Sequence, residues 1–390
     1  MELTSRVFKD NYTDYVEETF DLKVSDFAST RIPDLRVNRL PKDWQIGVIC
    51  GASGSGKSSI LRSLGEIISP SFDNNKSVLS NLAPLPPNEA AQLLSAMGLA
   101  SVPSWVRPFS TLSNGEQYRA KVAKIVSTIG EGQYALVDEY TSVVDRNVAK
   151  SMSVALAKYI RRNKKRIILA TCHYDILEWL QPDWIFDLNK GGVLERGDYL
   201  QRPRVQLQVY RTTSDTWRMF AKHHYMTSQL NESAQCFCFT WDNKVVGFAS
   251  TLPLFGKGII ESIRFHRIVV LPDFQGLGIG RGITNFTAAI YKSVGKRVYI
   301  KTINPRLGEY FEISHDWKMT IHNREYREDV NNSDLQRVKV RQERVSYCAE
   351  YIGKPIFGYE HLLKPIDQMR YDKSMEGQLL LFDEDSLSSI

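Results

Sequence analysis

A glycine-rich segment between an apolar run and a helical pattern constrains this chain most strongly. Residues 51–58 read GASGSGKS and fit the pattern G-x-x-x-x-G-K-[ST]. The apolar run from Gln45 to Cys50 predicts a buried strand before it, and the spacing from Ser58 to Leu64 predicts a helix after it. Small residues at such a turn let backbone N–H groups surround a polyphosphate, and the helix N-terminus adds positive potential. The segment therefore predicts a phosphate-binding loop.

Two further apolar runs, Tyr134 to Val137 and Arg166 to Thr171, also predict buried strands. Asp138 and Glu139 follow the first of them, and His173 follows the second. Three strands that each deliver polar groups at their C-terminal ends predict a doubly wound α/β sheet with a site along one edge.

If the loop binds ATP, its residues and Asp138 have specific expected roles. Lys57 would reach the β- and γ-phosphates, while Ser58 and Asp138 would hold Mg²⁺. The residues expected to bind ATP are Gly51, Ser53, Gly54, Ser55, Gly56, Lys57, Ser58 and Ser59. The structural alternative is a plain glycine-rich turn that opens a helix, with Asp138 and Glu139 at a solvated strand end.

A second motif, LSNGEQ at residues 112–117, precedes Asp138 and resembles the LSGGQ signature of the ABC ATPase family. The resemblance covers roughly residues 15–200. It implies that Glu139 polarises the attacking water and that His173 contacts the γ-phosphate. It also implies an ATP-dependent homodimer in which Ser113 and Gly115 of one copy complete the ATP site of the other. Taken alone, Ser113 could be a helix N-cap and His173 a turn residue.

This motif set departs from transporter subunits in three ways. The interval from Lys57 to Ser113 is short, Asn114 and Glu116 replace Gly and Gln in the signature, and no Q-loop glutamine is identified. Without that loop or an apolar stretch long enough to cross a membrane, a transporter role is disfavoured. The family resemblance instead implies a soluble, DNA-associated type of ABC ATPase.

The pattern changes between residues 190 and 215, which places a domain boundary near residue 205. The sequence predicts an ATPase domain over 1–205, a second α/β domain over 206–355 and a polar tail over 356–390. Within the second domain we expect a helix from Trp217 to Leu230 and one near Arg306 to Ile313. Strands are expected at 235–240, 244–250, 266–271 and 297–302.

A second glycine-rich turn, QGLGIGRG at residues 275–282, follows the strand that ends at Leu271 and precedes a helix from about Ile283. It resembles the [QR]-x-x-G-x-[GA] turn of the GNAT acetyltransferase superfamily, over about residues 210–325. The resemblance implies a mixed sheet and an N-acyltransferase that uses acetyl-CoA or another acyl-CoA. A dinucleotide site and a plain tight turn are the alternatives, but Lys301 stands where the dinucleotide site requires an acidic residue. The residues expected to bind acyl-CoA are Val269, Val270, Gln275, Gly276, Gly278, Gly280 and Arg281.

The sequence offers only a few candidates for the catalytic residues of this second site. Tyr310 lies where GNAT enzymes often carry a tyrosine general acid, although Phe311 competes for that position. His223, His224 and His266 are candidate bases, and each has the alternative of a structural histidine.

The segment Arg264 to Val270, with its glycine turn, resembles over about twenty residues the Mom-type DNA modification proteins of phages. This resemblance implies that the acceptor is an amino group on a DNA base. The net charge of +6 fits such an anionic partner, and a neutral solvated surface fits almost as well. An RNA base or a protein amine is the alternative acceptor, and a non-catalytic DNA-associated ABC scaffold is the alternative function.

The tail carries the run QLLLF at residues 378–382, which resembles the peptide that bacterial DNA-processing proteins dock into the sliding clamp. The contact residues would be Gln378, Leu379, Leu381 and Phe382. The alternative is a last strand or helix packed on the second domain.

The five cysteines are odd in number and stand mostly in apolar runs, so they are expected to be reduced core residues. The sequence shows no apolar stretch of 18 residues and no signal-peptide pattern at its start. We therefore expect a cytoplasmic protein of a bacterium or of a phage-infected cell.

Overall fold

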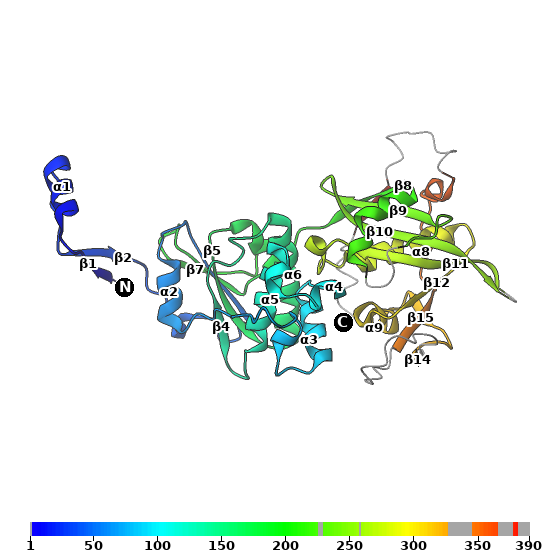
Figure 1. Ribbon diagram of the computed structural model, residues 1–390, viewed down its shortest axis with the longest axis horizontal. Coiled ribbons are helices and arrows are strands. Elements are labelled where there is room, and N and C mark those ends of the chain that lie inside the picture. Colours follow the sequence, from blue (N-terminus) through cyan, green and yellow to red (C-terminus); the bar gives the residue numbers. More distant parts are fainter. Residues whose placement is uncertain (1, 225–228, 257–258, 327–344, 366–376, 381–390) are drawn as a thin grey trace. The chain divides into compact units, whose positions relative to one another are not determined.

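The computed structural model describes the chain except for residues 1, 225–228, 257–258, 327–344, 366–376 and 381–390 (Figure 1). The contacts divide the mixed α/β chain into two units. The first unit comprises Met1–Ser71 with Lys124–Arg202, and the second comprises Phe72–Ala123 with Pro203–Ile390. Residues 72–123 lie within the range predicted for the first domain, but most of their contacts are with the residues of the second unit.

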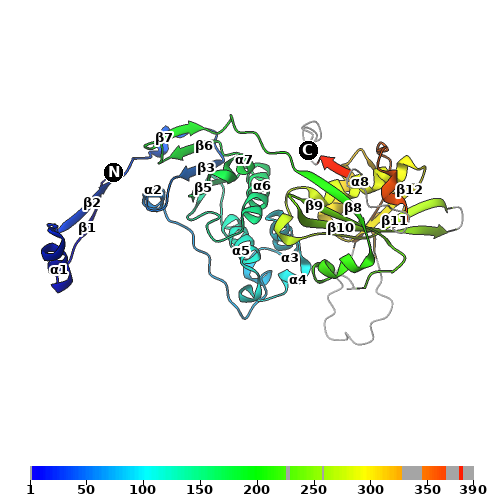
Figure 2. The same ribbon diagram turned by 90° about the horizontal axis from the view of Figure 1, so that it is seen from above.

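The first unit is built on a five-stranded sheet. Its strand order is β4-β5-β3-β6-β7, in which the first four strands are parallel and β7 is antiparallel to β6. Figure 2 shows β5, β3, β6 and β7 side by side. The strands are β3 (Ile46–Cys50), β4 (Tyr134–Val137), β5 (Arg166–Thr171), β6 (Trp184–Asp187) and β7 (Val193–Arg196). The three strands expected from the sequence are confirmed, and the parallel order brings their C-terminal ends to one edge.

Helices and aromatic residues surround this sheet. The helical elements are α2 (Lys57–Leu64), α6 (Arg146–Arg162), η4 (Tyr174–Ile176) and α7 (Leu177–Leu180). Trp44 and Trp184 pack edge to face in the core, with ring centroids 5.7 Å apart. A Cβ at Gly47 would lie 2.0 Å from the Trp184 ring, so the central strand β3 needs glycine there.

The first 40 residues add a small extension. It contains β1 (Glu2–Arg6), α1 (Asn11–Phe20), β2 (Phe27–Arg31) and η1 (Val37–Arg39), and β1 pairs with β2 antiparallel. Helix α1 buries none of its residues, and all five residues of β2 are exposed.

The second unit contains a nine-stranded mixed sheet. Eight strands follow the order β13-β15-β12-β11-β10-β9-β8-β16, and β14 pairs with β15. Strands β11 and β12 are parallel, whereas the other pairs are antiparallel. The bounds are β8 (Gln206–Thr212), β9 (Gln235–Trp241), β10 (Lys244–Gly256), β11 (Ile259–Val270), β12 (Arg297–Thr302), β13 (Trp317–Met319), β14 (Glu325–Tyr326), β15 (Val345–Tyr351) and β16 (Gly377–Leu380). The mixed sheet and the four strands expected from the sequence are confirmed.

The helices of this unit include α8 over the sheet, which begins four residues before the position expected from the sequence. The bounds are η2 (Ser80–Leu82), α3 (Pro87–Ala96), α4 (Val102–Trp105), η3 (Phe109–Thr111), α5 (Asn114–Ser127), η7 (Pro272–Phe274), α8 (Ile279–Ser293), α9 (Pro305–Ile313) and η8 (Glu360–Leu363). The expected helix near Arg306 to Ile313 is confirmed.

The expected helix from Trp217 to Leu230 was wrong. Two 3-10 turns, η5 (Ser214–Met219) and η6 (Ala221–His223), occupy its first part. Trp217 and Phe220 are both buried against Phe248. Their spacing of three residues suits the three-residue period of a 3-10 turn.

The first residues of the segment predicted as a polar tail, from residue 356, include two that pack on the second unit. Leu362 is 2% exposed, and Tyr359 packs edge to face on Phe286 of α8 at 5.1 Å. The backbone of Gly377–Leu380 forms β16, which pairs antiparallel with β8 and corresponds to the strand alternative for the tail. Leu381 and Phe382, named in the clamp prediction, lie outside the described residues.

All five cysteines are free thiols, as expected for reduced residues, but Cys172 is exposed and so is not a core residue. It follows β5 directly, where the chain leaves the sheet. Among the described residues, no helix has the length and apolar character needed to span a membrane.

Candidate functional site

The phosphate loop lies between β3, all of whose residues are buried, and α2. Gly54 and Gly56 have φ angles of 77° and 92°, and a Cβ at Gly56 would lie 2.7 Å from Ile32. The hydroxyl of Ser55 is buried and has no hydrogen-bond partner among the described residues. A phosphate oxygen would satisfy this orphaned hydroxyl, so the loop fits the group that its sequence implies.

Lys57 lies over its own loop. Its Nζ donates to the carbonyl oxygens of Gly51 at 2.9 Å and Ala52 at 2.6 Å. These carbonyls hold the ammonium at the mouth of the loop, and a bound phosphate would compete for it.

The ends of β4 and β5 carry the other residues expected at this site. Asp138 Oδ1 accepts from the backbone N–H of Glu139 at 2.9 Å. Glu139 and Thr141 have φ angles of 50° and 66°, a left-handed conformation that costs free energy in residues other than glycine. The turn is held by Tyr140, whose N–H donates to Ala170 O at 2.7 Å and whose carbonyl accepts from Thr171 Oγ1 at 2.9 Å.

His173 continues this edge, and its N–H donates to Thr171 Oγ1 at 3.1 Å. Burial, together with the charges of Arg146 and Lys57, lowers the pKa of His173 below its ordinary value. The ring is therefore neutral at pH 7 and can donate or accept one hydrogen bond. The structure thus brings Lys57, Glu139 and His173 to the same edge of the sheet, as the sequence predicted.

No cluster of three or more His, Cys, Asp or Glu side chains able to hold a metal occurs in the described part of the chain. Mg²⁺ needs only one or two protein ligands when a polyphosphate and waters supply the others. The Ser58 hydroxyl and the Asp138 carboxylate are therefore enough protein ligands for such an ion.

The signature motif lies in the second unit, at the start of α5. Ser113 N–H and Oγ both donate to Glu116 Oε2 at 3.0 Å, and Glu116 Oε1 accepts from Ser104 Oγ at 2.6 Å. Burial acts to raise the pKa of Glu116, but the hydrogen bonds from Ser104 and Ser113 outweigh it, so the pKa is lowered. Glu116, which departs from the signature consensus, thus completes a capping box with Ser113.

The second glycine turn joins β11 to α8. Gly276 and Gly278 have φ angles of 96° and 87°, and Gly278 is the N-cap of α8. A Cβ at Gly278 would meet no atom within 4 Å. The first backbone N–H groups of a helix have no partner within it, so this open turn fits an anion such as a pyrophosphate.

Strands β11 and β12 separate just before this turn. They are paired only from Ser262 and Arg297 to Arg264 and Tyr299. Beyond Arg264, the pairing of β11 with β10 shifts register, because Ser250 faces Arg267 while Thr251 faces Phe265. His266 is the extra residue of this β-bulge, which the sequence did not reveal. A bulge bends its strand, so it helps to open the gap between β11 and β12.

A pocket of about 110 Å³ occupies this gap. It is lined by His224, by residues 265–268 of β11, by residues 300–302 of β12, and by Asn304 and Leu307. Burial and the charges of Arg267 and Arg264 lower the pKa of His266 to about 4, and burial, Arg267 and His266 lower that of His224 to about 4. Both imidazoles are neutral at pH 7, and His266 Nε2 accepts from Asn231 N–H at 3.3 Å.

Tyr310 lies one turn beyond Leu307 on α9. Its hydroxyl accepts from Asn285 Nδ2 at 2.6 Å, and the Arg281 guanidinium carbon lies 5.1 Å from its ring centroid. Phe311 is fully buried, with its ring centroid 4.6 Å from that of Trp317. Of the two aromatic residues that the sequence left open, Tyr310 therefore carries the available polar group, and Phe311 belongs to the core.

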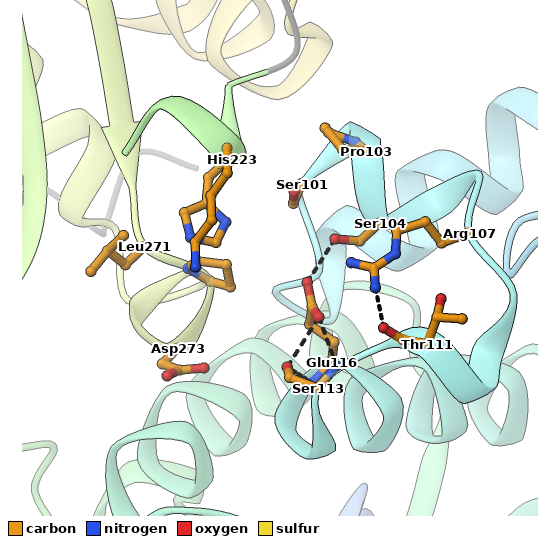
Figure 3. Close-up of a pocket in the computed structure, with 12 residues that line it drawn as sticks. Ser101, Pro103, Ser104, Arg107, Thr111, Ser113, Glu116, His223, Leu271 and Asp273 are labelled. Carbon is orange, nitrogen blue, oxygen red and sulfur yellow. Dashed lines mark hydrogen bonds between the residues drawn. The ribbon is translucent and has the colours of Figure 1, made fainter. Parts of the chain in front are cut away.

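His223, the third candidate base, lies away from this pocket. It lines a separate cleft of about 500 Å³, together with Leu271 and Asp273, opposite Ser113 and Glu116 (Figure 3). Burial and the neighbouring Lys222 lower the pKa of His223. The structure therefore places the start of the signature helix beside the glycine turn, a relationship that the sequence did not indicate.

The comparison with protein-family models agrees with the second glycine turn. Residues 174–312 match the family model of the acetyltransferase (GNAT) family, so the C-terminal region carries a GNAT acetyltransferase domain. The match includes the turn at 275–282, the pocket between β11 and β12, and Tyr310. A search of curated protein sequences gave no match.

Solved structures of ATP-binding cassettes resemble part of the chain. A dimeric post-hydrolysis state of the cassette MJ0796 with ADP and Pi is 15% identical, with a TM-score of 0.32, over 44% of this chain and 89% of that one. The cassette cbiO1 of Clostridium perfringens is 18% identical, with a TM-score of 0.31, over 42% of this chain and 76% of that one. The functional interpretation of the first unit therefore depends on its own motifs and sheet.

Proposed function

We propose that this protein is an ATP-regulated N-acyltransferase that uses acyl-CoA to modify an amino group on a DNA base. The observation that carries the acyl-transfer part is the gap between β11 and β12, which opens beside the N-terminus of α8. A thioester lying in the gap and a pyrophosphate at the turn would use one continuous surface.

Acyl-CoA, when bound, supplies an acyl group on a good leaving thiol. Backbone N–H groups at Gly276, Gly278 and Gly280 hold its pyrophosphate, and Arg281 adds positive charge there. The edge of β11 at Val269 and Val270 orients the thioester. Tyr310 donates its proton to the departing sulfur, because its hydroxyl already accepts from Asn285 and keeps its own proton free.

The acceptor amine must lose a proton when it attacks. His224 and His266 are neutral at pH 7 because their pKa values lie near 4, so each ring has an unprotonated nitrogen that can accept the proton transiently as the amine attacks. His266 Nε2 already accepts from Asn231 N–H, and His224 lines the same pocket.

The proposal of a nucleic acid acceptor is supported by charge around the pocket. Arg267 and Lys301 line it, and Arg264 stands at the point where the two strands part. The net charge of the chain is +6. Positive charge at a pocket mouth attracts a phosphate backbone, and an extruded base would present its exocyclic amine to the thioester.

The ATPase part of the proposal is an ATP-dependent homodimer. Ser113 and Gly115 of one copy would complete the ATP site of the other, while Glu139 would polarise water and His173 would contact the γ-phosphate. Residues 142–145 stand where the resemblance to ABC ATPases implies the D-loop. Val143 in this segment is 62% exposed, and a second copy would cover it. A sliding clamp would recruit the complex to DNA through the tail, and the site of action would be the cytoplasm.

Mass spectrometry of nucleosides tests this function. DNA from cells that express the protein should contain a nucleoside with a new acyl mass, which cells with an empty vector lack. A protein that binds acetyl-CoA but modifies neither DNA, RNA nor protein would instead be the non-catalytic scaffold.

A further inference from the structure

Arg119 is a charged residue buried inside the second unit. It lies on α5, three residues after Glu116, and is 0% exposed. Burying a guanidinium costs free energy unless its terminal donors find acceptors, because it has no neutral form at ordinary pH. Its Nη1 donates to Gly98 O at 2.9 Å and to Gln275 O at 3.3 Å, and its Nη2 donates to Asp273 O at 3.0 Å.

Two of these three acceptors belong to the loop that enters the acyl-CoA turn. Asp273 and Gln275 lie between β11 and Gly276, the first glycine of that turn. A planar guanidinium fixes the carbonyls it binds in both distance and direction. Arg119 therefore sets the orientation of the peptides immediately before the pyrophosphate-binding N–H groups.

The Gln275 side chain makes a second connection between the same segments. Its Oε1 accepts from Ala100 N–H at 2.8 Å, and its Nε2 donates to Val270 O at 2.9 Å. Gly98 permits this close approach, because a Cβ there would lie 2.1 Å from Arg119 Nη1 and 3.0 Å from Gln275 O. Hydrogen bonds of Gln275 and Arg119 thus connect the end of β11 and the glycine turn to residues 98–100, which precede the signature motif.

The N-terminal end of α5, which carries the signature motif, also lies beside the loop that enters the glycine turn. Ser113 and Glu116 form the first turn of the helix, and their cleft also contains Leu271 and Asp273 (Figure 3). A shift of α5 that accompanied nucleotide contact at Ser113 would therefore displace Arg119 relative to the loop carbonyls.

We propose that Arg119 is a positioning residue that couples the signature segment to the acyl-CoA turn. Nucleotide engaged at Ser113 and acyl-CoA engaged at α8 then change each other's affinity by the same factor, as linkage requires. This inference rests on the proposed function, because it needs both ligands to bind where that function places them.

The test is titration calorimetry on the full chain. The dissociation constant for acetyl-CoA is measured with and without saturating AMP-PNP and Mg²⁺, and that for AMP-PNP is measured with and without acetyl-CoA. For the unaltered protein we expect equal ratios in the two directions, within the range of about 5- to 150-fold typical of allosteric coupling.

The variants Arg119→Met and Gln275→Met should bring both ratios to within about twofold of one. Gln275→Met retains the buried guanidinium, so it tests the connection even if Arg119→Met does not fold. Arg119→Lys keeps the positive charge but loses the planar guanidinium. The logarithm of its coupling ratio should be less than half of that measured for the unaltered protein. The matched control is Arg211→Met, which removes another partly buried arginine of this unit, bonded to Cys236 O, and should leave both ratios unchanged.

Two results would overturn the inference. One is a folded Arg119→Met or Gln275→Met protein with the full coupling ratio. The other is an unaltered protein that binds both ligands independently, in which case the proposed function survives. Failure of the unaltered protein to bind acetyl-CoA would instead remove the proposed function, and this inference with it.

Discussion

The Tyr310 hydroxyl oxygen lies 2.6 Å from Asn285 Nδ2, from which it accepts a hydrogen bond. Asn285 Oδ1 in turn accepts from Trp317 Nε1 at 2.8 Å, which fixes the orientation of the amide. A phenol that accepts through its oxygen keeps its own proton to donate. This arrangement distinguishes Tyr310 from its buried neighbour Phe311.

Tyr310→Phe should lower kcat for acyl transfer about 10²-fold, because a general acid typically contributes a factor of this order or more. The KM for acyl-CoA should change less than threefold, since no binding contact is removed. Initial rates over a range of acyl-CoA concentrations measure both constants. Tyr199→Phe, which alters an exposed tyrosine in the other unit, serves as the control. An unchanged kcat would remove Tyr310 from the chemistry.

Glu139→Gln should trap an ATP-bound dimer, because hydrolysis slows while the phosphate loop and the Mg²⁺ ligands remain. Sedimentation with saturating ATP and Mg²⁺ should show twice the monomer mass, and Ser113→Arg in the same background should prevent this. A variant that stays monomeric would contradict the shared ATP site.

Gly278→Asp should abolish acetyl-CoA binding and leave ATPase activity within about twofold of the original. The new carboxylate would enter the open space in front of α8 and repel the pyrophosphate. Gly295→Asp is a matched control, because Gly295 also has a positive φ, of 78°, and a Cβ there would meet no atom within 4 Å. Calorimetric affinity that survives in Gly278→Asp would place the acyl-CoA site elsewhere.

Stability should fall as the pH drops from about 6.5 to about 4. The pKa values of His224 and His266 lie near 4 in the folded protein, below the ordinary value of 6.5, so in this range the unfolded chain binds more protons. Both rings are partly exposed, so we expect about 1 kcal/mol from each after solvent screening. Denaturant unfolding of the double variant His224→Gln and His266→Gln should show a flatter pH dependence. An equal slope in both proteins would contradict the assigned pKa values.

Replacing Gln378, Leu381 and Phe382 together by alanine should weaken binding to a bacterial sliding clamp at least tenfold, without changing ATPase activity. Each apolar anchor contributes about 2 kcal/mol when its pocket is left unfilled. Because the backbone of β16 pairs with β8, a free peptide spanning Glu376 to Asp385 should bind more tightly than the intact chain. Surface plasmon resonance compares the two. If neither binds at micromolar concentration, the tail segment is an edge strand only.

The sequence predicted three strands of the five-stranded sheet and four of the nine-stranded sheet, because the apolar runs of these strands end sharply at polar, proline or glycine residues. Gly51 directly follows β3, and Pro272 follows β11 after one residue, and the chain turns at both places. The local sequence pattern was sufficient to predict these elements, since strand, turn and helix follow one another along the chain.

Features that depend on distant contacts could not be predicted in this way. Arg119 looks like any surface arginine of an amphipathic helix, and only the folded unit shows that it is buried against Asp273 and Gln275, more than 150 residues away. The bulge at His266 arises from register with β10, which a single strand does not encode. The helix expected from Trp217 to Leu230 was wrong, because the spacing of three between the buried Trp217 and Phe220 fits a 3-10 turn as well as an α-helix.

Strand β16 has a consequence for truncated forms of the protein. It covers the outer edge of β8, whose hydrogen-bonding groups would otherwise face solvent. An uncovered strand edge is a template for pairing with other chains. Removal of the segment from Gly377 onward, or its capture by another protein, would therefore expose β8 and favour self-association through that edge.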